Sequence, residues 1–239
     1  MKARVLRLAA VMAAALASCG LMPMHAVAAT ATLAPRSIPV PLGQDTLPVT
    51  VSGVADYETH DGKATGEARL TGDLASAQQL ATSVLRALLD RDQRCGEHIA
   101  VREGHFAARA PALEVTALID YERRACFAGK TMTIVPRSDI SVDMLLHPVV
   151  GPRSLKVRGE VLTLRSAGTA IPSAAEGALR QALSALVSER IGELFPASAP
   201  DDLRLQEVAF ADGDAGQLIA RIGVVGSMPQ SLLDRLTHR

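Results

Sequence analysis

The strongest constraint on the fold is a change of hydrophobic period that occurs twice along the chain. Segments in which apolar and polar residues alternate are typical of half-buried strands, and they flank two stretches with the three-to-four spacing of amphipathic helices. The first stretch is QQLATSVLRALLDRD, residues 78–92, and the second follows Ser173. The order strand, strand, helix, strand, strand therefore recurs, and it predicts an α+β protein made of two ββαββ units.

Local signals fix several element ends. Asp61-Gly62, between two alternating segments, is a strong hairpin signal. Asp73 is well placed to cap the first helix, Ser173 opens a capping box at the second, and Pro229 precedes a short striped segment at the C-terminus. We expect an antiparallel sheet packed on long amphipathic helices, with a short C-terminal helix in the second unit alone.

The two halves of the chain share a pattern after each helix. IAVREGHFAARAPALEVTALI from Ile99 aligns with LRLQEVAFADGDAGQLIARIGV from Leu203, and Phe106 then matches Phe210. This pattern indicates an internal repeat, although convergence of two ordinary ββαββ units would produce it too. We assign residues 49–126 to the first unit and residues 127–239 to the second.

The N-terminus is a targeting segment. Lys2, Arg4 and Arg7 precede an apolar run from Leu8 to Ala17 that is too short to span a bilayer. Residues 1–28 are therefore interpreted as a signal peptide that delivers the chain to the periplasm. Residues 29–48, with four prolines and no clear period, are interpreted as an extended leader.

Two export signals overlap in LASCGLMPMHAVAA, residues 16–29. An ordinary cut after Ala28 is favoured, because the residues that follow Cys19 stay apolar where a lipoprotein tether is usually polar. The alternative is lipidation at Cys19, which would anchor the same folded chain to the envelope membrane.

The number of cysteines predicts one disulfide. With Cys19 removed or acylated, Cys95 and Cys126 remain as an even pair in an oxidising compartment. Two independent buried thiols are the alternative.

Composition argues against two classes of ligand. The 25 basic and 25 acidic residues cancel, so no overall field favours nucleic acid. Aromatic residues make up 3% of the chain and Trp is absent, which removes the stacking platforms that bind bases and sugar rings.

Catalytic and metal-binding motifs are missing from the sequence. It contains no H-E-x-x-H, no G-x-S-x-G and no phosphate-binding loop. The carboxylates of Asp212 and Asp214 fit a hairpin turn better than a calcium loop, and His98 with His105 fits solvated strand positions better than a metal site. We therefore predict no catalytic residue, no metal and no cofactor.

The stretch LFPASAPDDLRLQEVAFADGDAGQLIARIGVVGSMPQSLLDRL resembles the tail of small bacterial envelope proteins of the tubular lipid-binding type. The resemblance implies a helix, two long strands and a terminal helix that helps close an apolar groove, and hence non-covalent binding of a lipid in the periplasm. The first half, with CGEHIAVREGHF and YERRACF, is similar to secreted proteobacterial proteins, and that similarity implies no activity.

The leading hypothesis is a non-enzymatic periplasmic protein that binds a lipid or another apolar ligand in a groove between sheet and helix. Its groove residues would be Leu183, Leu186, Phe210 and Ile222, which could equally be plain core. The first alternative is an envelope scaffold or assembly factor that contacts another envelope protein. The second is a periplasmic hydrolase with a site assembled from distant residues, for which His105 and nearby carboxylates are the only candidates. A membrane would be reached only through a lipid anchor at Cys19.

Overall fold

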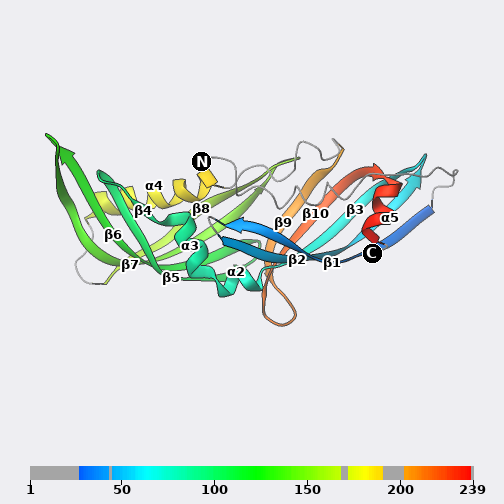
Figure 1. Ribbon diagram of the computed structural model, residues 1–239, viewed down its shortest axis with the longest axis horizontal. Helices are drawn as coiled ribbons and strands as arrows, with labels where there is room; N and C mark the ends of the chain where they lie inside the picture. The colour runs from blue at the N-terminus through cyan, green and yellow to red at the C-terminus, as the bar shows by residue number, and fades with distance from the viewer. Residues whose placement is uncertain (1–26, 43–44, 168–171, 191–201, 238–239) are drawn as a thin grey trace. The chain divides into compact units, whose positions relative to one another are not determined.

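The computed structural model of the chain describes residues 27–42, 45–167, 172–190 and 202–237. Within these residues the chain divides into two compact units, and Figure 1 labels their elements. Unit 1 holds the residues up to Ser76, the segment Pro148–Lys156 and the residues after Arg190; unit 2 holds Ala77–His147 and Val157–Arg190. The expected signal segment, with Cys19, lies outside the described residues apart from Val27 and Ala28.

Unit 1 is built on a five-stranded antiparallel sheet with the order β1-β2-β3-β10-β9, called sheet A. Its strands are β1 (Val27–Leu42), β2 (Asp45–His60), β3 (Lys63–Asp73), β9 (Arg204–Asp212) and β10 (Leu218–Pro229). A two-residue turn joins β2 to β3, and both of its residues, Asp61 and Gly62, have positive φ. The hairpin predicted at Asp61-Gly62 is therefore confirmed, because this turn geometry is the one that Asp-Gly favours.

The segment expected to be a proline-rich leader forms β1 and the start of β2. β1 is an edge strand, and it pairs with β2 along nearly its whole length, with an irregularity between Leu33 and Arg36. An edge strand tolerates prolines, because the missing N–H groups can lie on the side that has no partner strand. Residues 29–42 thus belong to the sheet instead of preceding it.

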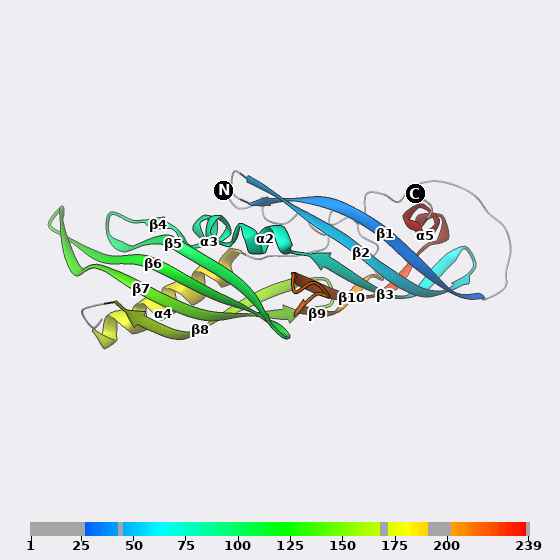
Figure 2. The ribbon, with the colours of Figure 1, turned by 90° about the horizontal axis from the view of Figure 1, so that it is seen from below.

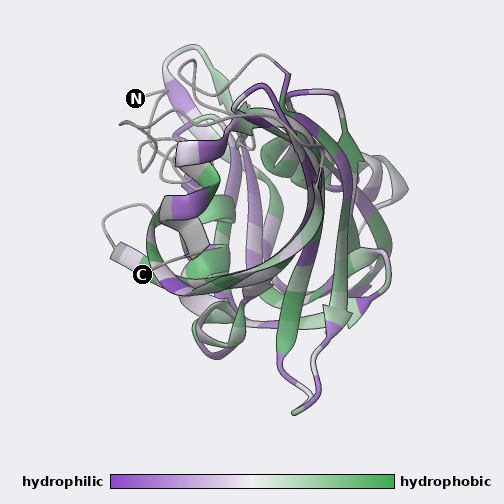
Figure 3. Cartoon of the chain, turned by 90° about the vertical axis from the view of Figure 1, so that its right-hand side faces the viewer, coloured by the Kyte–Doolittle hydropathy of each residue, from purple (hydrophilic) through white to green (hydrophobic). Residues whose placement is uncertain are grey.

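One face of sheet A is apolar. Residues that lie directly opposite each other in an antiparallel sheet point to the same side. The registers align the row Val51, Gly72, Ala220 and Phe210, then Gly53, Leu70, Ile222 and Val208, and then Ala55, Ala68, Val224 and Leu205. The intervening residues on the other face include Asp56, Glu67 and Arg69. Figure 3 shows hydrophobic and hydrophilic bands alternating along the strands.

Unit 2 is built on a second five-stranded antiparallel sheet with the order β4-β5-β6-β7-β8, called sheet B. Its strands are β4 (Arg91–Asp92), β5 (Gly96–Arg109), β6 (Ala112–Phe127), β7 (Lys130–Val150) and β8 (Leu155–Ser166). The ends of β7 and β8 that meet at their connecting turn belong to unit 1.

Two helices pack on sheet B, α3 (Ala81–Leu89) and α4 (Ser173–Arg190), and Figure 2 shows both beside its strands. α3 lies on β5, where Leu85 approaches Gly104, and α4 lies on β8, where Ser184 and Val187 approach Gly159. The core that they close is fully buried and includes Leu89, Ile119, Ile140, Leu179 and Leu183.

The predicted architecture of two ββαββ units, with antiparallel sheet packed on long amphipathic helices, is wrong. Most described residues lie in strands, and three of the four described helices have nine residues or fewer: α2 (Ala75–Gln79), α3 and α5 (Gln230–Thr237). The first predicted helix is broken at Leu80 into α2 and α3. The protein is therefore mainly β, although the expected C-terminal helix is present as α5.

The compact units also differ from the halves of the chain. Sheet A combines β2 and β3 with β9 and β10, and sheet B combines β5 and β6 with β7 and β8, so each sheet takes one hairpin from each half. The assignment of residues 49–126 and 127–239 to two repeats stays a prediction about the organisation of the sequence.

Candidate functional site

A partly enclosed apolar space lies in unit 1, where α5 covers one end of the apolar face of sheet A. α5 contacts β1, β3 and β10. The side chain of Leu233 is 2% exposed and clusters with Ala55 and Ala64, while Tyr57, Ala68 and Met228 pack around them. We call this space, between α5 and these strands, the α5 groove.

The α5 groove is narrow and lined mainly by small or apolar residues. Its cavity has a volume of about 30 Å³, and the lining includes Ala55, Tyr57, Ala64, Gly66, Ala68 and Leu233. This is about the volume that one water molecule takes up in liquid water, whereas pockets for small organic ligands measure roughly 300–1,000 Å³. The closed groove is therefore too small for a lipid, and a ligand would have to displace α5.

A pair of glycines lines the α5 groove. Gly66 of β3 and Gly226 of β10 lie directly opposite each other in the register. A Cβ on Gly66 would collide with the backbone of Asp56, and Gly226 has a φ of 154° with its backbone close to Asp202 and Leu203. Because neither position carries a side chain, neighbouring backbone can approach both glycines closely in the row that begins at Tyr57.

Two charged residues, Asp56 and Glu67, also line the cavity, and the carboxylate of Asp56 is paired. Asp56, between Ala55 and Tyr57 on β2, accepts hydrogen bonds from Arg69 at 2.6 Å and from the hydroxyl of Thr30 at 2.7 Å. Alternate residues of a strand point to opposite faces, so these polar contacts belong to the outer face of sheet A. The α5 groove is thus suited to an uncharged, apolar occupant.

The structure separates the four predicted groove residues into two pairs. Phe210 and Ile222 are half-buried in unit 1, in the first two rows of the apolar face of sheet A, so they extend the surface on which α5 lies. Leu183 and Leu186 lie on α4 in unit 2 with exposures of 0% and 1%, within the core against sheet B. The small residues of the α5 groove were missed, although alternate Ala and Gly from Ala64 to Ala68 are a signal for it.

A larger hollow in unit 2 has a different character. It lies between β8 and α4, measures about 630 Å³, is open to solvent and is lined by Arg158, Glu160 and Arg180 among others. The guanidinium of Arg180 already donates to Glu176 and to the carbonyl of Val161. An open, charged surface offers an apolar ligand little burial, so we do not place the site there.

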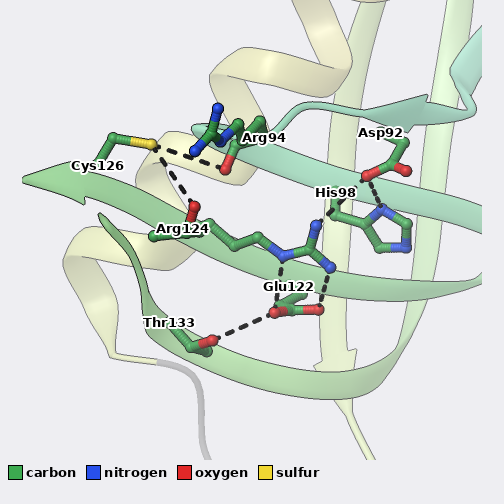
Figure 4. A network of polar contacts seen from close by, with 8 residues as sticks. Asp92, Arg94, His98, Glu122, Arg124, Cys126 and Thr133 are labelled. Carbon is green, nitrogen blue, oxygen red and sulfur yellow. Dashed lines mark hydrogen bonds and ion pairs between the residues drawn. The ribbon is translucent and has the colours of Figure 1, made fainter. Parts of the chain in front are cut away.

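The predicted disulfide between Cys95 and Cys126 is confirmed, with a Cα–Cα distance of 5.5 Å. It joins the β4–β5 connection to the end of β6, next to a network of polar contacts (Figure 4). There Arg124 binds both carboxylate oxygens of Glu122 at 2.9 Å, and its hydrogen bonds hold the pKa of Glu122 below its ordinary value. Asp92 contacts Arg124 and the ring of His98, at 3.4 and 3.1 Å.

Two buried ionisable side chains lie side by side on β6. Asp120 is 5% exposed, and a hydrogen bond from Arg137 holds its pKa below its ordinary value despite the opposing effect of burial. Tyr121 is fully buried, and burial raises the pKa of its phenol, with a further contribution from the charge of Glu97. Asp120 forms ion pairs with Arg102 and Arg137, which is typical of a structural ion-pair network.

Within the described residues, no group of three or more His, Cys, Asp or Glu side chains is placed to hold a metal ion. His105, a candidate residue of the hydrolase alternative, is exposed on β5 opposite Thr116. No helix among the described residues is long and apolar enough to cross a membrane.

Comparison of the chain with protein-family models, with curated proteins and with solved structures finds no match.

Proposed function

We propose that the chain is a non-enzymatic protein of the periplasm that binds an acyl chain, or a similarly slender apolar molecule, in the α5 groove. The observation that carries the proposal is the narrow apolar cavity between Leu233 and the glycine pair Gly66–Gly226. Small side chains on both sides of this pair suit a chain of methylenes better than a ring system.

The length of the apolar face supports this choice of ligand. From the row of Ala64 and Met228 to the row of Val51 and Phe210 the register advances eight residues along β3 and β10. At about 3.4 Å per residue this is roughly 27 Å, an upper limit for a twisted sheet. One leaflet of acyl chains fills about half of a 30 Å bilayer core, so the face is long enough for one chain.

Two of the contacts that α5 would lose when the groove opens can be compared with the burial of an acyl chain. Burial of the Leu233 side chain contributes about 2 kcal/mol, and the hydrogen bond from the Gln230 N–H to the Gly62 carbonyl about 1 kcal/mol. Each methylene that leaves water contributes about 0.8 kcal/mol. About four buried methylenes would therefore offset these two contacts.

The disulfide supports the compartment. Disulfides persist in oxidising compartments such as the bacterial periplasm and are rare in the cytosol. Together with the basic and apolar N-terminal segment, the Cys95–Cys126 bridge favours export. Whether Cys19 is lipidated does not alter the proposal, because either cut leaves both sheets almost intact.

Titration of the exported protein with a fluorescent fatty acid tests the proposal. We expect saturable binding, at least tenfold weaker in Ala68→Phe, which fills the groove beside Leu233. Thr65→Phe is the matched control, since Thr65 is exposed on the opposite face of the same strand, and it should bind like the wild type. Absence of uptake by the wild type, or equal binding by Ala68→Phe, would refute the proposal.

The alternative of an envelope scaffold makes a different prediction. A scaffold would give crosslinked complexes with another envelope protein in cells, and Ala68→Phe would leave them unchanged because the groove would have no part in them. Native mass spectrometry adds a second distinction, since a ligand-binding protein would carry a co-purified lipid and a scaffold would not.

A further inference from the structure

The end of the β6–β7 hairpin in unit 2 gathers most of the large apolar side chains that the described residues expose. Phe127 is 77% exposed, and Met132 and Ile134 are each 59% exposed. Only Leu80 and Val149 are comparable in the rest of the described chain. Exposed apolar side chains that cluster in this way mark surfaces that meet an apolar partner. We call the segment from Arg123 to Val135 the hairpin tip.

The hairpin tip is held in a fixed shape by its turn. Ala128 and Gly129 both have positive φ, 49° and 77°, as in the tight two-residue turns that match the twist of a hairpin. Arg94 donates from its guanidinium to the carbonyl of Gly129 at 3.4 Å. The turn is thus tied to the β4–β5 connection.

The two faces of the hairpin tip differ. Cys126 lies opposite Thr131 and Arg124 opposite Thr133, so the disulfide braces one face together with the Arg124–Glu122 contacts, which Figure 4 shows. The alternate residues point the other way: Phe127 lies opposite Lys130, and Met132 lies opposite Ala125, while Ile134 lies at the register shift between the Arg124–Thr133 and Arg123–Val135 pairs. The apolar side chains are therefore presented by a braced scaffold, and little order has to be gained when they bind.

The charge of the hairpin tip complements an anionic surface. Between Glu122 and Arg137 the chain carries four cationic side chains and a single carboxylate. Arg123, Arg124 and Arg137 pair with Glu97, Glu122 and Asp120 respectively. Lys130, directly beside Phe127 at the turn, forms no ion pair within the described residues. A cation beside exposed apolar side chains is the arrangement that a lipid surface with anionic headgroups attracts.

We propose that the hairpin tip inserts shallowly into an anionic phospholipid surface. Phe127, Met132 and Ile134 enter the boundary between headgroups and acyl chains, where aromatic side chains are favoured, and Lys130 meets the phosphates. Three side chains at the end of a two-stranded hairpin are fewer than the 20–30 residues that each partner contributes to a standard protein interface, which favours a lipid occupant.

This inference does not rest on the α5 groove, which lies in unit 1. It also differs from the expectation that only a lipid anchor at Cys19 would bring the chain to a membrane. A protein that fails to bind fatty acid could still bind vesicles through the hairpin tip, so the two proposals fail separately.

Vesicle flotation of the exported Cys19→Ala protein tests the inference, because this background excludes an acyl anchor. We expect binding to vesicles that contain phosphatidylglycerol, weaker binding to phosphatidylcholine alone, and loss of binding as salt rises. The triple variant Phe127→Ser, Met132→Ser, Ile134→Ser should bind at least tenfold more weakly, and Lys130→Glu at least threefold. Leu80→Ser with Val149→Ser is the matched control, which removes the other exposed apolar residues and should bind like the parent.

A fluorescence measurement keeps the test independent of the triple variant. The chain has no Trp, so Phe127→Trp places a single reporter at the turn. Its emission should shift to the blue with anionic vesicles, and that of Val149→Trp should not. The inference would be overturned if the parent did not bind vesicles, or if the triple variant bound them equally well. It would also be overturned if the emission of Phe127→Trp did not shift, or if the tip captured a protein partner without binding vesicles.

Discussion

The backbone N–H of Gln230 donates a 3.0 Å hydrogen bond to the carbonyl oxygen of Gly62. This bond ties the first residue of α5 to the β2–β3 turn, and three residues later Leu233 enters the cluster with Ala55 and Ala64. α5 is therefore attached to the sheet at both its start and its centre. A short helix held in this way can act as a removable cover, and its attachment can be tested one contact at a time.

Leu233→Ala should loosen α5 without unfolding the sheet. Loss of this buried side chain should lower the free energy of unfolding of unit 1 by about 2 kcal/mol and speed amide exchange between Gln230 and Thr237. Leu80→Ala, at a half-exposed position in unit 2, should change stability by less than about 0.5 kcal/mol. If amide exchange in α5 were unchanged, Leu233 would not be what attaches α5 to the sheet.

Two glycine substitutions should change stability in opposite directions. Gly66→Ala should lower the free energy of unfolding by about 2 kcal/mol, because its Cβ would collide with the backbone of Asp56. Gly177→Ala should raise it by about 0.5–1 kcal/mol, since Gly177 is exposed on α4 with no neighbour in reach. Urea unfolding measures both, and a stable Gly66→Ala would contradict the close approach of β2 and β3.

Local features were predictable from the sequence, and long-range pairing was not. Asp61-Gly62 specifies its turn through the conformations that these two residues allow. The Cys95–Cys126 bridge was predictable because these are the two cysteines that remain besides Cys19. The pairing of β3 with β10 joins segments from different halves of the chain, and alternation alone does not choose a partner strand.

The break at Leu80 explains part of the error in fold class. The apolar stripe runs through both α2 and α3, and no Gly or Pro interrupts residues 75–89, so periodicity alone predicts one helix. Packing of Ala81 and Leu85 on Gly104 of β5 fixes the direction of α3, and this contact is tertiary. The α5 groove was missed for a similar reason, because Gly66 and Gly226 come from distant segments that meet only in the sheet.

Reduction of the disulfide should destabilise unit 2. The cysteines are 31 residues apart, and on the chain-entropy model the bridge contributes about 3.5 kcal/mol. Cys95→Ser with Cys126→Ser should lower the urea midpoint to that of the reduced wild type. Addition of reductant to the double variant is the control and should change nothing. If reductant still lowered the urea midpoint of the double variant, the effect of reductant would not come from the Cys95–Cys126 bridge.

Acid should remove the contribution of Asp120 to stability. Its folded-state pKa lies below the ordinary value of 3.8, because Arg137 hydrogen-bonds its carboxylate. The unfolded chain therefore takes up the proton first, so the stabilisation is complete well above pH 3.8 and is lost as pH falls through the folded pKa.

Asp120→Asn should accordingly cost about 1–2 kcal/mol at neutral pH and progressively less as the pH falls below the ordinary pKa. Urea unfolding at neutral and acidic pH measures the difference. Glu58→Gln, at an exposed position of β2, is the control and should have little effect at either pH. A cost that stays constant with pH would show that the charge of Asp120 is not responsible.

Photo-crosslinking with a fatty acid that carries a diazirine on its acyl chain tests the central claim most directly, because it reports where the ligand lies. The α5 groove predicts labels on the segments 55–57, 64–68 and 224–228, extending toward Ile222 and Phe210, which excess unlabelled fatty acid should abolish. Labels concentrated on α4 around Leu183 and Leu186, or labels that do not respond to competition, would contradict the account.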